Sequence, residues 1–195
     1  MKRLKEKNIP VQDCQVYCLQ NTQGSGKDVL LLHGAKFSAS TWQELGTLDV
    51  LVDAGHRVHA LDMPGYGKSP KCGSNPPALL QEIIAAEGMQ SPVVIGPSLG
   101  GAYSLALYFS ASRKTGGLVL VGTVGVDKLK NRIREIDVPC LVVWGDRDQV
   151  STLDNAYFLD KEIKDSKLVI LENAKHPCYL DQPKRWHEEL LNFLS

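Results

Sequence analysis

Short apolar runs alternate along the chain with longer stretches whose apolar positions recur every three or four residues. The apolar runs predict buried strands at residues 29–32, 58–61, 93–95, 118–121, 140–144 and 168–171. The stretches between them predict helices at residues 42–54, 79–87, 99–110, 153–161 and 185–194. Because this alternation is typical of a mostly parallel sheet with helices on both faces, we expect an α/β fold. Residues 15–19 predict an additional antiparallel edge strand.

Chain length and charge limit the organisation and the partners. A chain of 195 residues with 43% hydrophobic side chains fits one domain over residues 1–195, in which the lysine-rich residues 1–10 are expected to form a solvated tail. Twenty-two basic and 22 acidic residues cancel, so no global field favours nucleic acid or an anionic membrane. No apolar stretch approaches the roughly 18 residues that cross a bilayer, and we expect a soluble protein.

The cysteines argue against both disulfides and metal. There are five, an odd number in a chain large enough to fold without disulfides, and we expect reduced thiols in the cytoplasm or also in the nucleus. Cys14 and Cys18 have no second pair of metal ligands nearby in the sequence, so we expect them to be strand residues that face the same way. No metal site is predicted.

The pentapeptide Gly-Pro-Ser-Leu-Gly at residues 96–100 lies between a predicted strand and a predicted helix. This is the context of a nucleophile elbow, in which a strained serine is exposed on a sharp turn and small neighbours allow close approach of the chain. Ser98 is therefore the predicted nucleophile.

A serine hydroxyl is a weak nucleophile, so it needs a general base and an acid that orients the base. Among the five histidines, His176 follows the predicted strand 168–171 and could reach the carboxyl ends of the strands. His33 also ends a strand, but the glycine after it favours a role in bracing its loop. We expect the other three histidines to be structural.

Two carboxylates follow the predicted strand 140–144, and Asp148 extends further toward the expected position of the histidine than Asp146, which is better placed to cap the turn. The chain order Ser98, Asp148, His176 is that of the α/β-hydrolases. Backbone N–H groups of Leu99 and of Ala35, in the loop after strand 29–32, are the expected oxyanion donors. Lys36 beside that loop either attracts an anionic substrate such as coenzyme A or faces solvent.

Several segments resemble the α/β-hydrolase superfamily and, more specifically, the 14B branch of the α/β-hydrolase domain-containing protein 14 group. They are Leu-Leu-Leu-His-Gly-Ala-Lys-Phe-Ser-Ala-Ser-Thr-Trp-Gln-Glu-Leu-Gly-Thr-Leu, Leu-Asp-Met-Pro-Gly-Tyr-Gly-Lys-Ser, Pro-Ser-Leu around Ser98, and His-Pro-Cys-Tyr-Leu-Asp from His176. The resemblance implies an α/β-hydrolase fold, a Ser98–Asp148–His176 triad and esterase activity on small acyl groups. It also implies removal of acetyl from protein lysines with transfer to coenzyme A, no required cofactor, and a partner in the transcription machinery.

The connection between the strands ending at residue 121 and beginning at residue 140 is too short for the cap domain that larger hydrolases insert there. We therefore expect a shallow, open pocket that takes a small acyl ester or acetyl-lysine. Two alternatives remain open: a non-catalytic protein-interaction module on a hydrolase scaffold, because fold does not fix function, and a cofactor-free perhydrolase with the same triad.

Overall fold

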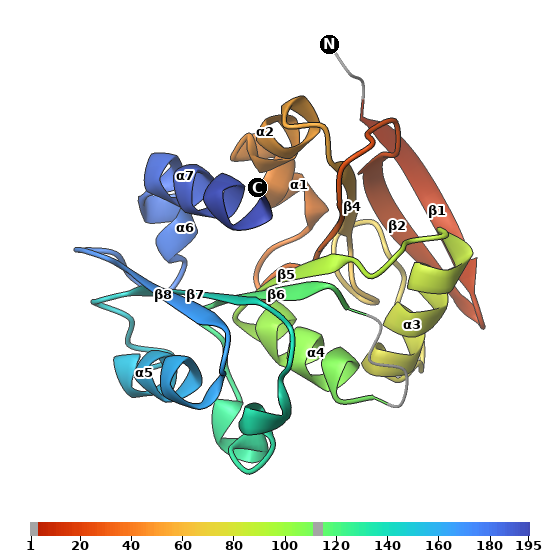
Figure 1. Cartoon of the computed structure of the whole chain (residues 1–195). Helices are drawn as coiled ribbons and strands as arrows, with labels where there is room; N and C mark the ends of the chain where they lie inside the picture. Colours follow the sequence, from red (N-terminus) through yellow and green to blue (C-terminus); the bar gives the residue numbers. More distant parts are fainter. Residues whose placement is uncertain (1–3, 111–114) are drawn as a thin grey trace.

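A computed structural model describes residues 4–110 and 115–195, and in these residues eight strands form one sheet (Figure 1). The sheet order is β1-β2-β4-β3-β5-β6-β7-β8. β1 pairs antiparallel with β2 and β2 antiparallel with β4, and all the other pairs are parallel. The strands are β1 Lys5–Val11, β2 Cys14–Asn21, β3 Asp28–Leu31, β4 Arg57–Leu61, β5 Val93–Pro97, β6 Gly117–Val121, β7 Cys140–Gly145 and β8 Ser166–Leu171.

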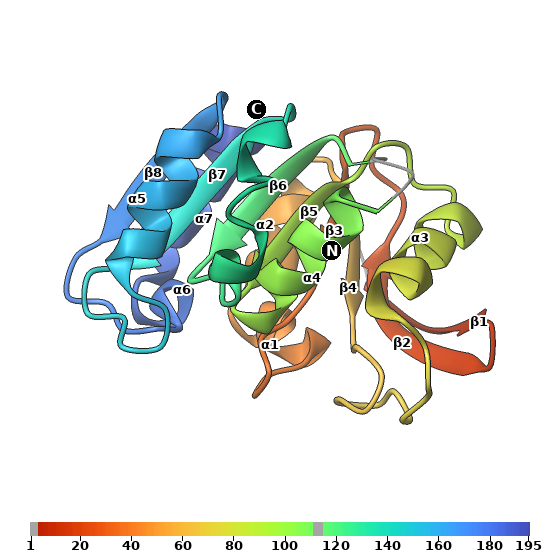
Figure 2. The same cartoon turned by 90° about the horizontal axis from the view of Figure 1, so that it is seen from below.

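Helices cover both faces of this sheet. One face carries α1 Ala39–Glu44, α2 Thr47–Asp53, α6 Cys178–Asp181 and α7 Pro183–Leu194, and the other carries α3 Pro76–Ala86, α4 Leu99–Tyr108 and α5 Leu153–Glu162. Figure 2, seen from below, has α3, α4 and α5 in front of the strands. Each face has its own apolar core, and the stacked rings of Trp42 and Trp186 join α1 to α7 in the first. The predicted α/β class is confirmed.

All six predicted parallel strands are present, each within two residues of its expected bounds. Both faces of the central strands are buried, and every residue of β5, β6 and β7 is buried. This explains why these strands appear in the sequence as continuous apolar runs rather than as alternating patterns. The arrangement brings the carboxyl ends of β3, β5, β6, β7 and β8 to the same edge of the sheet.

Three predictions about local structure are wrong. The helix expected over residues 42–54 is two helices, because Gly46 has a left-handed backbone with φ +82° and begins α2 in a new direction. Residues 5–10 belong to strand β1 rather than to a solvated tail, since Ile9 and Val11 are buried against the core. β1 therefore covers β2, which is antiparallel as expected but is not the edge strand. Residues 1–3 of the predicted tail lie outside the described residues.

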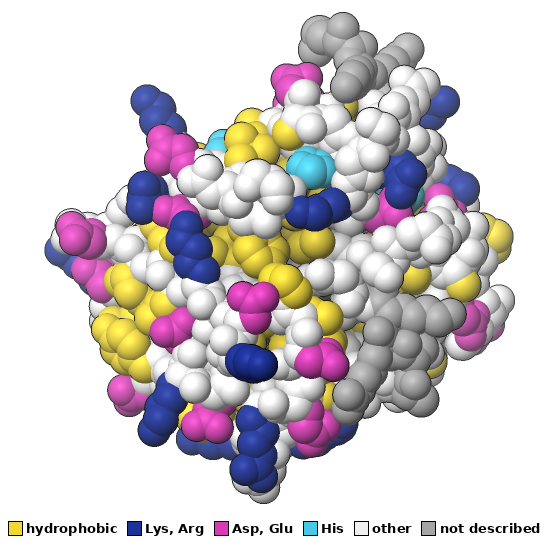
Figure 3. Space-filling view, in the orientation of Figure 1, with side chains coloured by type: hydrophobic (Ala, Val, Ile, Leu, Met, Phe, Trp, Pro, Cys, Tyr) yellow, Lys and Arg dark blue, Asp and Glu magenta, His cyan; other side chains and the backbone are white. Residues whose placement is uncertain are grey.

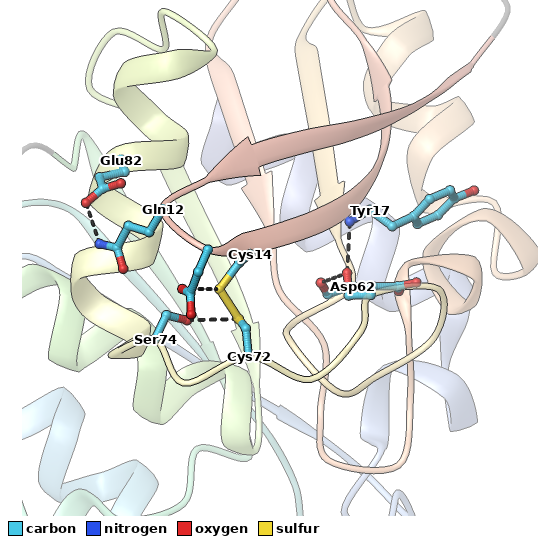
Figure 4. The surroundings of a disulfide bond; sticks show 9 residues. Gln12, Cys14, Tyr17, Asp62, Cys72, Ser74 and Glu82 are labelled. Carbon is cyan, nitrogen blue, oxygen red and sulfur yellow. Dashed lines mark hydrogen bonds between the residues drawn. A yellow bond between two sulfur atoms is a disulfide. The ribbon is translucent and has the colours of Figure 1, made fainter.

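The expectation of five reduced thiols is also wrong. Cys14, at the start of β2, forms a disulfide with Cys72 in the loop before α3 (Figure 4). The hairpin of β1 and β2 brings the two sulfur atoms together across 58 residues of sequence. Cys18, Cys140 and Cys178 are buried free thiols, and Cys18 shares a core with Cys14, as expected for two residues on one strand face. The cysteine count therefore no longer favours a cytoplasmic or nuclear location.

The connection from β6 to β7 contains only two short 3₁₀ turns, Val126–Leu129 and Ile133–Glu135. No cap domain is present between these strands, as the length of the connection predicts. The face drawn in Figure 3 intersperses basic and acidic side chains, which agrees with the zero net charge. Within residues 4–110 and 115–195, no helix has both the length and the apolar character needed to cross a membrane.

Candidate active site

Ser98 occupies the sharp turn between β5 and α4 and has a backbone conformation that non-glycine residues rarely adopt, with φ +53° and ψ −113°. Its N–H donates to the carbonyl of Val121 at the end of β6 (2.8 Å), and its carbonyl accepts from Gly101 in the first turn of α4 (3.1 Å). The surrounding sheet and helix therefore fix this strained backbone. A strained residue on a sharp strand-to-helix turn is the feature that the sequence predicted for a nucleophile elbow.

The glycines on either side of Ser98 are required by close packing. A Cβ atom on Gly96 would overlap the Gly100 carbonyl and the Ser104 hydroxyl, because β5 passes directly beneath the first turn of α4. A Cβ atom on Gly100 would lie 2.9 Å from the carbonyl oxygen of His33. The steric reason expected for the Gly-x-Ser-x-Gly pattern thus holds on both sides of the serine.

His176 and Asp148 lie in the loops that follow β8 and β7, and the structure brings their side chains into contact. His176 Nδ1 is 2.7 Å from Asp148 Oδ2, and the Asp148 side chain is fully buried. The other oxygen of Asp148 accepts hydrogen bonds from the N–H groups of Val150 (2.8 Å) and Ser151 (2.9 Å). Since a carboxylate only accepts, the tautomer of the imidazole that fits this contact has its hydrogen on Nδ1 and leaves Nε2 as an acceptor.

His176 Nε2 is buried and, among the described residues, has no hydrogen-bond partner. The Ser98 hydroxyl is therefore not hydrogen-bonded to it. The two residues are nevertheless held at one edge of the sheet, because Ser98 bonds to Val121 and the next residue, Gly122, lies against the imidazole. Catalytic hydrogen bonds are often long or misaligned until substrate binds, and a buried unpartnered acceptor is available for one.

Gly122 was not singled out in the sequence, although it directly follows a predicted strand. Its φ is +51°, and a Cβ atom on it would lie 3.2 Å from Asp148 Oδ2 and 3.3 Å from His176 Nδ1. The sequence feature that could have identified Gly122 is that it is a glycine at a strand end, beside the expected acid and base. Only this residue type combines the left-handed backbone with room for the Asp148–His176 pair.

The loop after β3 lies against the elbow. A Cβ atom on Gly34 would be 3.5 Å from Ser98 Cβ, which puts the neighbouring Ala35 close to the serine. His33 fixes this loop: its Nδ1 lies 2.8 Å from the Gly34 carbonyl, and its Nε2 accepts from the Met63 N–H (3.0 Å). Burial lowers the pKa of His33, so the ring is neutral and braces the loop rather than serving as a base.

The second predicted oxyanion donor, Leu99, is the first residue of α4, where N–H groups have no acceptor within the helix. Lys36 is exposed on the loop after β3, and Asp146 is exposed at the end of β7. Burial and the nearby charge of Asp148 raise the pKa of Cys178 to about 12, so this neighbouring thiol stays protonated. In the described part of the chain, no cluster of three His, Cys, Asp or Glu side chains is arranged to hold a metal ion.

Comparison with known proteins identifies the family. Residues 29–136 match the model of the alpha/beta hydrolase family. The chain is 36% identical to human ABHD14B, provisionally named a protein-lysine deacylase, over 98% of this chain and 95% of that protein. The chain belongs to the α/β-hydrolase family. Zebrafish (Danio rerio) ABHD14A is another relative of this hydrolase, 35% identical over 86% of the chain and 64% of its own length.

Solved structures agree with the hydrolase fold. A protein described as a CIB-like hydrolase from Thermoplasma acidophilum superposes with a TM-score of 0.93 at 24% identity, covering 98% of both chains. The esterase RhEst1 from Rhodococcus sp. ECU1013 has a TM-score of 0.82 at 18% identity and covers 100% of this hydrolase and 98% of its own chain. At these identities the likeness establishes the fold.

Proposed function

We propose that this protein is a serine hydrolase that removes small acyl groups through a covalent acyl-Ser98 intermediate. The observation that carries the proposal is the Asp148–His176 hydrogen bond of 2.7 Å. It leaves Nε2 of the imidazole, which has no hydrogen-bond partner among the described residues, as an acceptor at the edge of the sheet that holds Ser98. A serine after β5, an acid after β7 and a histidine after β8, all at the carboxyl edge of one sheet, are the components of acyl transfer by nucleophilic catalysis.

In the acylation step, the Ser98 oxygen attacks the carbonyl carbon while its proton moves to His176 Nε2. Asp148 stays ionised, accepts the hydrogen bond from Nδ1–H and stabilises the imidazolium that forms. The N–H groups of Leu99 and Ala35 stabilise the negative charge on the carbonyl oxygen. The tetrahedral intermediate then expels the alcohol or amine, which takes the proton from Nε2, and the acyl group stays on Ser98.

A second acceptor completes the cycle. Water, or the thiol of coenzyme A, gives its proton to His176 Nε2 and attacks the acyl carbon; the Ser98 oxygen leaves and recovers that proton. The products are a free acid or a new thioester, and Ser98 is regenerated. We propose acetyl-lysine and small acyl esters as substrates because the described connection between β6 and β7 carries no cap domain and because ABHD14B is named for deacylation of protein lysines.

Replacing the nucleophile tests the proposal. Ser98→Ala is expected to lower turnover of 4-nitrophenyl acetate by about 10⁴–10⁶-fold, since the members of a triad act as one unit. Ser104→Ala is the matched control: it removes a hydroxyl of the same helix that donates a hydrogen bond to the Gly100 carbonyl. Its turnover should stay within a few-fold of the parent.

A fluorophosphonate probe separates the enzyme from a non-catalytic interaction module. The probe should label the parent protein at Ser98, with the adduct located by peptide mass spectrometry, and should not label Ser98→Ala. Turnover of Ser98→Ala at the parent rate would reject the proposal. Failure of the folded parent to react with the probe would favour the interaction module.

A further inference from the structure

A cavity of about 420 Å³ opens beside the imidazole of His176, and no step of the proposed reaction uses it. It lies between the loop after β7 and the loop after β8. Four of its six lining side chains are exposed, so the cavity faces solvent. We call it the cationic pocket, and it is lined by Arg147, Gln149, Val150, Lys175, His176 and Pro177.

Arg147 is held by its backbone and its side chain and Lys175 by its backbone, and neither charge is neutralised. The Arg147 N–H donates to the Ala174 carbonyl (2.9 Å), and its guanidinium donates to the side chain of Asn173. The Lys175 N–H donates to Asp181 Oδ2 (2.7 Å). Within the residues that the structure describes, no carboxylate lies within 4.0 Å of the guanidinium of Arg147 or the ammonium of Lys175.

The two acidic residues nearest to Arg147 in sequence do not pair with it. Asp148 is buried behind the imidazole, where the two backbone N–H groups and His176 satisfy its oxygens. Asp146 is exposed on the same loop as Arg147 and is not part of the pocket lining. By contrast, the neighbouring surface cation Arg185 is paired with Glu189 at 2.5 Å. The cationic pocket therefore offers unpaired positive charge to a ligand.

The remaining lining of the pocket can contact an apolar stem, meaning the apolar part of a ligand that carries its charged group. Val150 keeps 65% of its surface exposed, an unusually high fraction for a large hydrophobic side chain, and it lines the pocket together with Pro177. A flat aromatic or short alkyl group that ends in a carboxylate or phosphate could cover Val150 and place its charge near Arg147 and Lys175. Apolar contact and charge would then act on the same molecule.

We propose that the cationic pocket selects substrates whose leaving component carries an anionic group, a carboxylate or a phosphate, on an apolar stem. The inference rests on the proposed function. In that reaction His176 returns a proton to the departing alcohol or amine, so the leaving component lies against the imidazole, whereas the carbonyl oxygen lies toward Leu99 and Ala35. The pocket shares the His176 wall and contains neither of these oxyanion residues.

The test compares two acetyl esters that differ in charge on the leaving component, 4-acetoxybenzoate and its neutral methyl ester. The readout is the ratio of their kcat/KM values. The two esters differ in chemical reactivity, but this difference is the same for every variant and cancels when the ratios of two variants are compared. A second pair, the mono-4-nitrophenyl ester of glutaric acid and 4-nitrophenyl valerate, carries the charge on the acyl side instead.

The variants are Arg147→Gln, Lys175→Gln and the double variant, with Lys184→Gln as the matched control. Lys184 is an exposed lysine that lines a different surface cavity. We expect each single variant to lower the anionic-to-neutral ratio of the acetoxybenzoate pair by about fivefold, the equivalent of an exposed ion pair of roughly 1 kcal/mol, and the double variant to lower it further. Lys184→Gln should leave the ratio unchanged.

The outcomes separate the two proposals. Absence of turnover of the neutral ester by the parent would reject the proposed function. Turnover by the parent with a ratio that the double variant does not change would overturn the cationic pocket while leaving the hydrolase intact. A change confined to the glutarate and valerate pair would likewise overturn the assignment to the leaving component.

Discussion

The orientation of His176, the proposed base, depends on the carboxylate of Asp148. Asp148→Asn keeps the size of the side chain and one oxygen for the N–H groups of Val150 and Ser151. The amide nitrogen would then face His176 Nδ1 and donate to it, which selects the tautomer that carries its hydrogen on Nε2. Because that nitrogen could no longer take the serine proton, we expect kcat for 4-nitrophenyl acetate to fall by about 10³–10⁴-fold with little change in thermal stability.

Asp146→Asn provides the control in the same loop. Asp146 is exposed and lies two residues before Asp148, and the equivalent change there is expected to alter kcat less than twofold. A large loss in Asp146→Asn together with normal turnover in Asp148→Asn would show that the orienting acid has been assigned to the wrong residue of the pair.

For the individual residues of the candidate active site, residue type and chain order predicted much of the arrangement, but not its atomic contacts. An acid and a histidine after adjacent strands could be expected to lie close together, and His176 is hydrogen-bonded to Asp148. The roles of Ser98, Ala35, Leu99 and Lys36 remain predictions. Gly122 was missed because its importance comes from contact with two side chains that arrive from later strands.

The close packing of β5 beneath α4 can be tested by substituting Gly96 of β5. In Gly96→Ala the new methyl group would overlap the Gly100 carbonyl, which is helix backbone and cannot rotate away, so β5 and α4 must separate. We expect a loss of about 2 kcal/mol or more in the free energy of unfolding, within the range of overpacked cores, measured by urea denaturation. The elbow should distort as well and turnover should fall.

Gly73→Ala is the matched control for this substitution. A Cβ atom on Gly73, in the loop before α3, meets no atom within 4 Å, and its backbone is not left-handed. The change should be neutral or should stabilise the protein by a few tenths of a kcal/mol, because alanine restricts the unfolded chain. Equal stability of the two variants would contradict the close crossing described for β5 and α4.

Elements were predicted best where burial alone determines them. The central strands β5, β6 and β7 are buried on both faces, so their positions could be found without knowing their neighbours. β1 was missed because its residues Lys5, Glu6 and Lys7 are exposed, and only pairing with β2 makes them a strand. The Cys14–Cys72 disulfide could not be predicted for a related reason: the pairing of β1 with β2 and the course of the loop before α3 decide which sulfur atoms meet.

At the scale of the whole molecule, a buried histidine couples stability to pH. His59, in the middle of β4, is 1% exposed, and among the described residues neither of its ring nitrogens has a hydrogen-bond partner. Burial lowers its pKa below 6.5, and the opposing attraction of Glu87, 3.9 Å away, and of Asp28 does not reverse the shift. Lys7, which is paired with Glu87, and Arg57 act in the same direction as burial.

Because the folded pKa is depressed, the unfolded chain takes up a proton at His59 before the native protein does. The associated stability is fully present above pH 6.5 and is lost as the pH falls from there toward the folded pKa, at up to about 1.4 kcal/mol per pH unit. His59→Phe replaces the ring by an apolar one and removes this dependence. Urea denaturation at pH 7.5, 6.5 and 5.5 should therefore show a smaller loss of stability on acidification in the variant, by up to about 1 kcal/mol. Parallel pH curves for the two proteins would mean that His59 takes up its proton equally well in the folded and unfolded chains, and acid sensitivity would then have to come from other groups.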